Sequence, residues 1–502
     1  MVEKNVLDSE PSVYNYNEAN ERTPLLQNSQ SNMAERNVGI SQETLVSQAG
    51  QSIKAKRFFQ YIASLAATLG AVAAGMMLAW TSPAGEGGIK LSKVYNVPIS
   101  EEEFSWIGAL APFGAAVACI PIGILTDIIG RKNSMLILVV PFTIGWLLII
   151  FANSIAMFYV GRFITGFSGG AFCVTAPMYT AEISESEIRG STGSYFQLLL
   201  TIGILLVYLL GTCVDMFVLS IISAIVPLIF AVVFFFMPET PTYYLMKGNE
   251  SAARASYIRL RGAHYNVEPE LSIQKETLEQ SSRNKTSFLT AFKSKACKKA
   301  IIISYGLMLF QQLSGVNAVI FYVGSIFEKA GGDLDPNIAS IIVGVMQVGA
   351  VFVSTLIVDR LGRRLLLLIS IVAMCTCTFL LGIYFFLSQE QGVTGIGWLP
   401  LLSVCVFIIL FSLGFGPLPW MMISELFAPE IKGIAGSSAC LLNWLMAFIV
   451  TKVYANLNSV LESYGTFWLF SVICAIGIAF VIILVPETKG KSLEQIQREL
   501  NT

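Results

Sequence analysis

Charge is scarce in this sequence. Asp, Glu, Lys and Arg make up 13% of its 502 residues, against about 25% in ordinary soluble domains. The net charge is −1, so overall charge gives no reason to expect binding to nucleic acid or to an acidic ligand. His264 is the single histidine and lies in a polar stretch. A zinc site or a Ser-His catalytic triad is therefore nearly excluded.

Cysteine is present but forms no framework. None of the nine cysteines belongs to a Cys-x-x-Cys pair, and most lie inside apolar runs. Such cysteines are usually free thiols, buried or facing lipid, rather than disulfides or metal ligands. We therefore expect no bound metal.

Long hydrophobic runs with few charged residues recur along the chain. A membrane-spanning helix needs about 20 mostly apolar residues. Twelve stretches meet this length, at about 59–80, 104–126, 134–152, 156–180, 191–212, 216–237, 300–327, 337–358, 365–388, 398–424, 433–451 and 465–485. They predict an all-α membrane protein with 12 transmembrane helices in the lipid bilayer.

Lys and Arg are distributed unevenly between the loops. The loops after even-numbered spans hold most of them, including a basic loop at 240–299. By the positive-inside rule these loops and both termini are cytoplasmic. We expect a disordered cytoplasmic arm at 1–55, a six-helix half at 56–240, a cytoplasmic linker with short helices at 241–299, a second six-helix half at 300–486 and a cytoplasmic tail at 487–502.

Three charged motifs occur once in each half and in the same order. "GILTDIIGRK" (123–132) is matched by "LIVDRLGRR" (356–364), "EIRGSTGS" (187–194) by "EIKGIAGS" (430–437), and "PETPTYY" (238–244) by "PETKGKS" (486–492). Parallel repeats of this kind are an established transporter design.

The charges in these motifs are candidates for a cytoplasmic gate. Gly130 and Gly362 permit a tight turn, and Arg offers a two-pronged fork to a carboxylate. Such pairs would hold the cytoplasmic side shut while the outer side is open; the alternative is solvated charges that merely follow the positive-inside rule. Lys432 replaces Arg189 and loses the fork, so the first half should hold more firmly. The candidates are Asp127, Arg131, Glu182, Arg189, Asp359, Arg363, Arg364, Glu425 and Lys432.

Amides within the spans suit a sugar ligand. An amide both donates and accepts hydrogen bonds, as a sugar hydroxyl does, and an indole offers an apolar face with one N–H. In the seventh span, Gln312 and Asn317 lie on different helix faces from Gln311, so these amides converge only if the helix bends. Amides that join helices and tryptophans of an interfacial belt are the alternatives.

The motifs together resemble those of the sugar porters of the major facilitator superfamily, over roughly residues 57–497. Besides the repeats they include "GRFITG" (161–166), "QQLSGVNAVIFY" (311–322), "GPLPWMMISE" (416–425) and "NW" (443–444). The stretch "LGAVAAGMMLAWTSPA" (69–84) is most similar to the insect facilitated trehalose transporters and to the mammalian glucose-transporter branch with dileucine signals.

This resemblance implies the major facilitator fold, with two six-helix halves around one sugar site. It implies no enzyme activity and no cofactor. It places Tyr322 in an outer gate, and it assigns the sugar contacts to Gln197, Gln311, Gln312, Asn317, Gln347, Trp420, Asn443 and Trp444.

The first span lacks the acid of proton-coupled relatives. The corresponding stretch is "GMML" (75–78), and proton coupling needs an acid that titrates inside the membrane. We therefore expect facilitated transport of trehalose or a hexose by alternating access. A proton-coupled symporter and a non-transporting sugar sensor are the alternatives. Arg162, inside the fourth span, is expected to pair with an acid at a helix end.

The N-terminal arm contains "ERTPLL" (21–26). Glu21 followed by Leu25 and Leu26 matches an acidic dileucine sorting signal, which adaptor proteins recognise; the alternative is a chance match. The signal predicts a protein of the cell membrane that also reaches endosomes or lysosomes.

Overall fold

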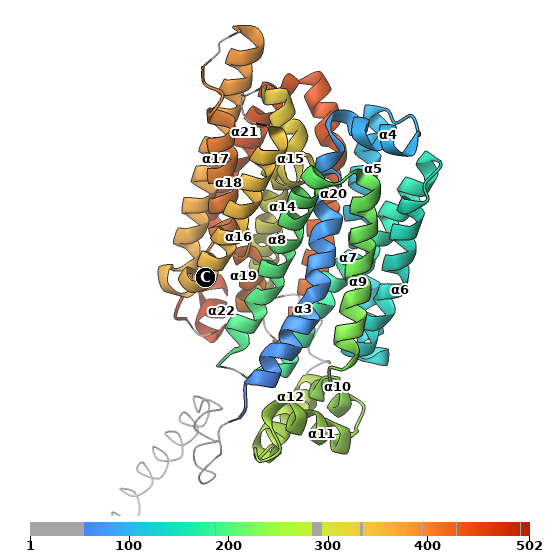
Figure 1. The fold of residues 1–502 in the computed structure, drawn as a ribbon. Helices are drawn as coiled ribbons and strands as arrows, with labels where there is room; N and C mark the ends of the chain where they lie inside the picture. Colours follow the sequence, from blue (N-terminus) through green and yellow to red (C-terminus); the bar gives the residue numbers. More distant parts are fainter. Residues whose placement is uncertain are drawn as a thin grey trace, which may run out of the picture.

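The computed structural model describes residues 55–185, 187–283, 294–331, 335–392, 395–427, 429–491 and 493–501. Every regular element in these ranges is a helix, and Figure 1 shows them side by side in a tall bundle. Within these described ranges, eleven helices are long and apolar enough to cross a membrane. The predicted sorting signal, Glu21, Leu25 and Leu26, lies outside the described residues.

The first half contains six long helices. They are α3 (Phe58–Ala79), α5 (Glu101–Ile129), α6 (Arg131–Ile150), α7 (Ile155–Ile183), α8 (Arg189–Cys213) and α9 (Met216–Phe235). Five are among the eleven apolar helices, and α7 is not. The 29 residues of α7 include Arg162 and many Gly, Ser and Thr residues, which lower its hydropathy. With α7 the spans number twelve, as the sequence predicts.

Two helix starts in this half, those of α5 and α9, are fixed by side-chain caps. Ser100 accepts the main-chain N–H of Glu103, whose carboxylate accepts the N–H of Ser100 at 2.8 Å. This reciprocal capping satisfies two free donors of α5. Asp215 caps α9 in the same way, by accepting the N–H of Val218 at 2.9 Å.

Two spans of the second half are interrupted. The seventh consists of α14 (Lys295–Leu313) and α15 (Val316–Ala330), and the tenth of α18 (Leu399–Leu410), a π-turn at Phe411–Phe415 and α19 (Leu418–Leu426). The other four are continuous: α16 (Pro336–Leu361), α17 (Arg363–Glu390), α20 (Pro429–Val460) and α21 (Glu462–Leu484). Irregular backbone at membrane depth needs partners from the protein or from a wet cavity.

Short helices lie at the two ends of the bundle. Between α3 and α5 the chain forms two 3₁₀ turns, Ser82–Ala84 and Glu86–Gly88, and α4 (Ile89–Tyr95). We call this the α4 end. At the opposite, linker end lie α10 (Pro241–Met246), α11 (Glu250–Arg261), α12 (Glu268–Arg283) and α22 (Leu493–Asn501). The linker helices share a small core around Tyr257 and Leu271.

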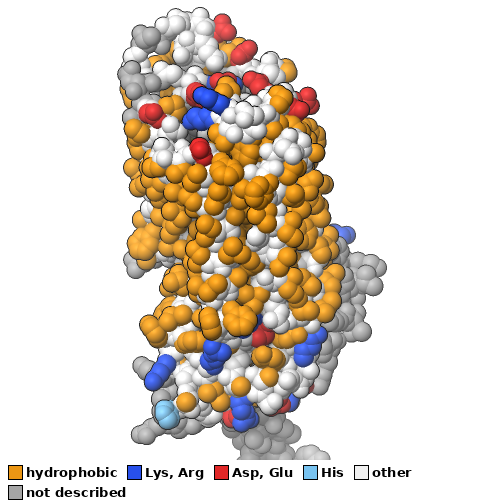
Figure 2. Space-filling view, turned by 45° about the vertical axis from the view of Figure 1, so that its right-hand side comes forward, with side chains coloured by type: hydrophobic (Ala, Val, Ile, Leu, Met, Phe, Trp, Pro, Cys, Tyr) orange, Lys and Arg blue, Asp and Glu red, His pale blue; other side chains and the backbone are white. Residues whose placement is uncertain are grey.

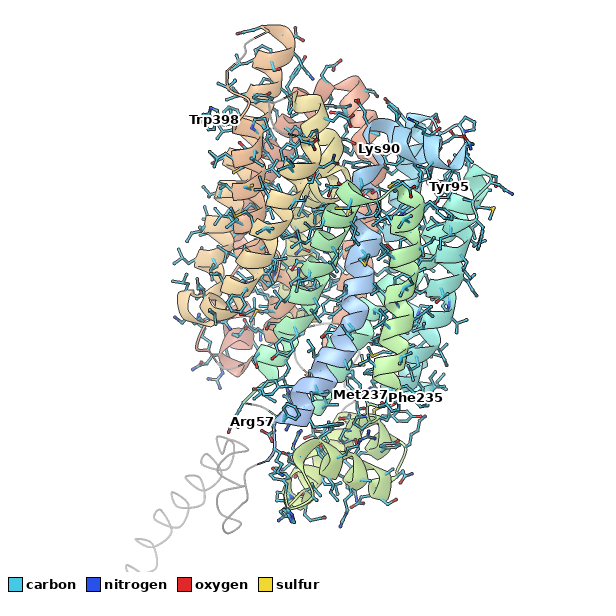
Figure 3. The ribbon with its side chains drawn as sticks, viewed as in Figure 1. Arg57, Lys90, Tyr95, Phe235, Met237 and Trp398 are labelled. Atoms are coloured by element: carbon cyan, nitrogen blue, oxygen red, sulfur yellow. The ribbon has the colours of Figure 1, made fainter. Side chains whose placement is uncertain are left out.

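The outer surface suits a bilayer. Figure 2 shows an apolar belt around the middle of the bundle, with charged side chains gathered at the two ends. Figure 3 places Lys90, Tyr95 and Trp398 toward the α4 end and Arg57 at the linker end. Polar and aromatic side chains at these levels are typical of membrane–water interfaces.

Close helix contacts depend on glycine. A Cβ on Gly75 of α3 would lie 2.0 Å from the main-chain oxygen of Leu200, and one on Gly203 of α8 would lie 2.3 Å from that of Val72. The two helices therefore meet backbone to backbone, as small residues allow in membranes.

This contact predicts a stability difference between two glycines of α8. Gly203→Ala should lower the melting temperature of the purified protein by several °C, because the methyl group forces α3 and α8 apart at a cost of about 1–3 kcal/mol. A Cβ on Gly193 would have no atom within 4 Å, so Gly193→Ala is the matched control and should not destabilise. Thermal melts followed by intrinsic fluorescence measure both; equal shifts would contradict the close contact.

Candidate functional site

An amide cluster lies at the break in the seventh span. Gly315 has φ of 88°, a conformation that glycine adopts without strain, and it separates the end of α14 from the start of α15. The turn lets the Asn317 amide donate to the Gln312 side-chain oxygen. Gln312 in turn donates to Asn443 Oδ1 at 2.8 Å. The bend that the sequence required is therefore present.

The cluster extends to the break in the tenth span. Asn443 donates to Gln311 Oε1 at 2.6 Å. Gln311 donates to the main-chain oxygens of Phe415 and Gly416 at 2.7 and 2.9 Å, where the π-turn ends. The four amides thus connect α14, α15 and α20 to the irregular part of the tenth span. Part of their hydrogen-bonding capacity joins helices, as the alternative interpretation expected.

The other four predicted contacts stand apart from this cluster. Gln347 of α16 is buried and Gln197 of α8 is half-buried. Trp444 is 9% exposed, whereas Trp420 is 38% exposed. Among the described residues no hydrogen bond joins any of them to the amide cluster. The structure therefore brings together Gln311, Gln312, Asn317 and Asn443 of the eight.

Tyr322 closes the bundle on the α4 side of the cluster. It is a second irregular point in α15, with φ −125° and ψ 18°. Its hydroxyl donates to the main-chain oxygen of Thr451 at 3.3 Å, and its ring stacks on Tyr454 with centroids 5.3 Å apart. A Cβ on Gly108 of α5 would lie 2.8 Å from the Tyr322 hydroxyl. Tyr322 thus lies between the two halves.

Other polar contacts join the halves at the α4 end. Thr81 donates to the main-chain oxygen of Phe321 at 3.1 Å, and Tyr208 donates to that of Ile320 at 3.0 Å. These carbonyls precede the irregular Tyr322. The α4 end is therefore closed in this structure by first-half hydroxyls bound to α15.

Lys452 also closes this end, and sequence reasoning missed it. Its ammonium donates to Ser105 Oγ at 2.8 Å, lies 4.8 Å from the centroid of Trp106 and 4.0 Å from Glu102. Lysine of α20 thus binds α5 through a hydrogen bond, an ion pair and a cation–π contact. The signal in the sequence was a lone Lys just beyond the predicted edge of the eleventh span.

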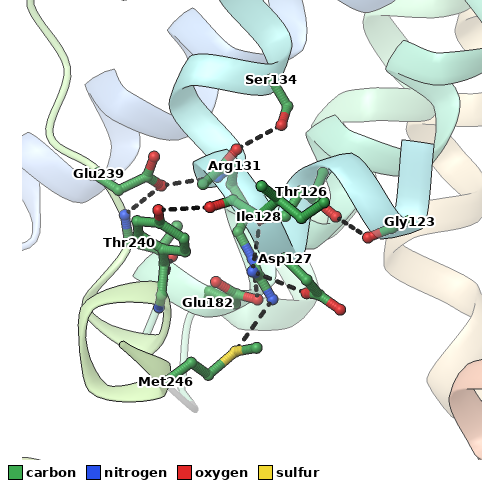
Figure 4. Close-up of polar contacts among 12 residues, drawn as sticks. Gly123, Thr126, Asp127, Ile128, Arg131, Ser134, Glu182, Glu239, Thr240 and Met246 are labelled. Carbon is green, nitrogen blue, oxygen red and sulfur yellow. Dashed lines mark hydrogen bonds and ion pairs between the residues drawn. The ribbon is translucent and has the colours of Figure 1, made fainter. Parts of the chain in front are cut away.

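At the linker end, the predicted gate charges pair within each half. Arg131 is 5% exposed and binds Glu182 at 2.9 Å and Asp127 at 3.2 Å, as Figure 4 shows. Arg363 binds Glu425 at 3.2 Å in the second half. The equivalent pair therefore forms in both repeats.

Two further gate candidates, Arg189 and Arg364, form no such pair with a carboxylate of the described residues. Arg189 donates to the main-chain oxygen of Ser184 at 3.4 Å, and Arg364 to that of Ile482. Both side chains therefore bind helix carbonyls instead of carboxylates. The side chains of Asp359 and Lys432 lie outside the described set.

Glu239 and Glu487 complete the repeat and were not predicted. Glu239 accepts the main-chain N–H groups of Arg131 and Lys132 at 3.1 and 3.0 Å, at the start of α6. Glu487 accepts those of Arg363 and Arg364 at 2.9 and 3.0 Å, at the start of α17. A carboxylate is favourable at a helix N-terminus because of the free N–H groups and the helix dipole. The repeated "PET" was the signal in the sequence.

The glycines before these helices make room for the carboxylates. Gly130 has φ of 97°, and a Cβ there would lie 2.3 Å from Glu239 Oε2; Gly362 has φ of 90°. Burial raises the pKa of Glu239 above its ordinary value, although main-chain N–H groups oppose the shift. Burial has the same tendency at Glu487, but there the N–H groups prevail and lower the pKa.

Arg162 contradicts one expectation from the sequence. Its side chain is fully buried, and it donates to the main-chain oxygens of Met77 and Ile107 at 2.8 and 3.0 Å. No carboxylate of the described residues pairs with it. Because α3 contains no acid, main-chain carbonyls accept these hydrogen bonds, and Arg162 links α7 to α3 and α5.

Comparison with known proteins identifies the family. The family described as "Sugar (and other) transporter" matches residues 26–500. The chain belongs to this family. It is a multi-pass membrane transporter and not an enzyme, since its relatives are transporters.

Two similar relatives are insect proteins. The chain is 41% identical to "Facilitated trehalose transporter Tret1" of Culex quinquefasciatus, over 88% of this chain and 86% of that protein. It is 42% identical to the Tret1 of Bombyx mori, over 88% and 87%. Among solved structures, the partially occluded inward-open xylose transporter XylE from E. coli has a TM-score of 0.73 at 23% identity, over 86% of this chain and 99% of that chain. That likeness supports the major facilitator fold.

Loss of the Lys452 cation should loosen the α4 end. In Lys452→Met, an impermeant maleimide added on the α4 side should label a cysteine introduced at the buried Thr451 about ten- to thirtyfold faster, because the variant loses both the cation–π contact and the hydrogen bond, each worth about 1 kcal/mol. Peptide mass spectrometry separates this label from those on native cysteines.

Lys329→Met is the matched control. Lys329 binds Glu86 of the other half at 3.1 Å, but both side chains are about one-third exposed, so this pair should contribute little. Equal acceleration in both variants would show that Lys452 has no special part in closing the α4 end.

Proposed function

We propose that this transporter carries a sugar, trehalose or a hexose, by facilitated diffusion and alternating access. The observation that carries the proposal is the amide cluster at the paired breaks of the seventh and tenth spans. Among the described residues, the side-chain oxygen of Asn317 accepts no hydrogen bond, and Gln312 uses one of its two N–H donors. Free donors and acceptors at membrane depth suit a ligand rich in hydroxyls.

The names of the relatives support this substrate class. The insect proteins are facilitated trehalose transporters, and the similarity extends over most of the chain. Gln197, Gln347, Trp420 and Trp444 would then reach the sugar as the halves close on it.

The absence of an acid in α3 favours uncoupled transport. Its residues 75–78 are Gly, Met, Met and Leu, and the adjacent Arg162 binds carbonyls. Without an acid that titrates at this depth, proton coupling has no evident carrier. A symporter remains the alternative, and a proton flux that depends on sugar would reveal it.

Orientation and gating complete the proposal. We place the linker end and both termini in the cytoplasm, so that the present structure is closed to the outside. The two moving halves are residues 56–240 and 300–486, joined by the linker at 241–299. When the outside opens, the linker ends approach, and the charges around Arg131 and Arg363 would hold them together.

The arm adds a proposal about location. With Glu21, Leu25 and Leu26 as a sorting signal, adaptor proteins would move the carrier between the cell membrane and endosomes or lysosomes. Replacing both leucines with Ala should increase its amount at the cell surface.

Uptake into proteoliposomes tests the function. Labelled trehalose, glucose and fructose are offered separately, and at least one should equilibrate without accumulating and without a pH change inside. Gln312→Ala should raise the half-saturation concentration about tenfold, because it removes hydrogen bonds worth roughly 1–1.5 kcal/mol. Gln274→Ala, in the linker helix α12, is the control and should not change it. Sugar binding without uptake would favour a sensor, and no effect of Gln312→Ala would exclude the proposed site.

A separate experiment tests the gate. Glu182→Gln removes the charge that faces Arg131 and should slow maximal transport several-fold while leaving sugar affinity nearly unchanged, because the pair lies far from the amide cluster. Glu268→Gln, which breaks an exposed pair with Arg254, is the control. A large loss of affinity at an unchanged maximal rate would contradict a gating role.

A further inference from the structure

A pocket lies at the linker end of the second half. Its volume is about 310 Å³, and it lies between the first turns of α14 and α17, the end of α21 and helix α22. Its polar side chains are Lys299, Arg364 and Glu499, and the remaining wall is aliphatic. No residue of the amide cluster lines it.

The positively charged side chains that line this pocket have few partners among the described residues. Arg364 binds the main-chain oxygen of Ile482 through Nη2, and among the described residues its buried Nε–H has no hydrogen-bond partner. Lys299 forms no hydrogen bond or ion pair within the described part of the chain. The carboxylate of Glu499 is already bound to Lys491 at 2.7 and 2.8 Å. Two cationic side chains, Lys299 and Arg364, therefore line the pocket with hydrogen-bonding capacity to spare, which suits a phosphate.

At the equivalent corner of the first half, a protein side chain covers the helix ends. Lys132 occupies the repeat position of Arg364, and Phe235 and Phe236 precede "PET" as Ile483 and Leu484 do. There, Arg259 of α11 donates to the main-chain oxygen of Phe236. Figure 3 places Phe235 beside the linker helices. In the second half, α22 lies at this corner, and no linker helix of the described residues lines the pocket.

The wall of the pocket continues into the apolar belt. Ile302 and Ile483, which line it, are 55% and 76% exposed, so on this side the opening faces the hydrocarbon region. A ligand that fits has an anionic phosphate and an apolar substituent. Basic pockets between helix ends at the membrane surface suit lipid head groups.

We propose that this pocket binds the phosphate of an anionic phospholipid from the leaflet at the linker end. Lys299 and the free Nε–H of Arg364 hold the phosphate oxygens, and the acyl chains lie along Ile302 and Ile483. The lipid thereby covers the junction between two helix ends next to a gate motif in the second half. Arg259 covers the equivalent junction in the first half.

Native mass spectrometry of the full-length protein tests the site. The detergent-solubilised protein is titrated with phosphatidylglycerol, with phosphatidylcholine and with inorganic phosphate. Phosphatidylglycerol should bind more tightly than the other two, and Lys299→Gln should weaken its binding about tenfold through loss of one charge-assisted hydrogen bond. Lys299→Arg should retain most of the affinity.

Lys298→Gln is the matched control, because Lys298 is the exposed neighbour and does not line the pocket. It should change phosphatidylglycerol binding less than about twofold, and equal melting temperatures would show that both variants fold. Equal binding of the two lipids, or equal effects of the two lysine variants, would overturn the proposal. Inorganic phosphate binding as tightly as phosphatidylglycerol would overturn a lipid as the source of the phosphate.

Discussion

In a bilayer, every main-chain polar group must find a partner within the protein or in a water-filled cavity. The rest of this structure depends on that constraint. Pro419 has no N–H to donate to the Phe415 carbonyl four residues earlier, and Gln311 binds the main-chain oxygens of Phe415 and Gly416 at the end of the π-turn. The same amide accepts from Asn443. The breaks and the amide cluster therefore depend on each other. The carbonyls at the break in the tenth span need the amides as partners, and the amides converge because the seventh span is broken.

The repeat applies the same logic at the linker end. A turn through glycine leaves the first N–H groups of α6 and α17 free, and a glutamate of "PET" accepts them in each half. In each half, this hydrogen bonding fixes the end of that half's sixth span against the start of its third span. The arginine that follows the glycine then points to an acid of the fourth span. Among the described residues the halves differ in what covers this end: linker helices lie against the first half, and α22 lies against the second.

Periodicity and composition were enough to predict the twelve spans, the repeat and the need for a bend in the seventh span. They were enough because each depends on the chain's own pattern: apolar length, motif order, and amides that cannot share one face of a straight helix. Side-chain partners were harder. Arg162 was expected to bind an acid and binds carbonyls of Met77 and Ile107, and Lys452 was overlooked. Which groups meet between membrane helices depends on helix rotation and close packing, and a single sequence does not encode these in a readable pattern.

One helix connects the proposed site to the closed end. Asn317 lies in the first turn of α15, and Tyr322 lies five residues further, roughly 7 Å along the axis. The carbonyls of Ile320 and Phe321 between them accept hydroxyls from the first half. A shift of Asn317 toward a ligand therefore moves the acceptors that keep the α4 end shut. Because α15 is irregular at both Gly315 and Tyr322, it can move as a short rigid piece while α14 stays packed. Sugar binding and opening of the α4 end are then coupled through this one short segment, and no separate chain of residues is needed to connect them.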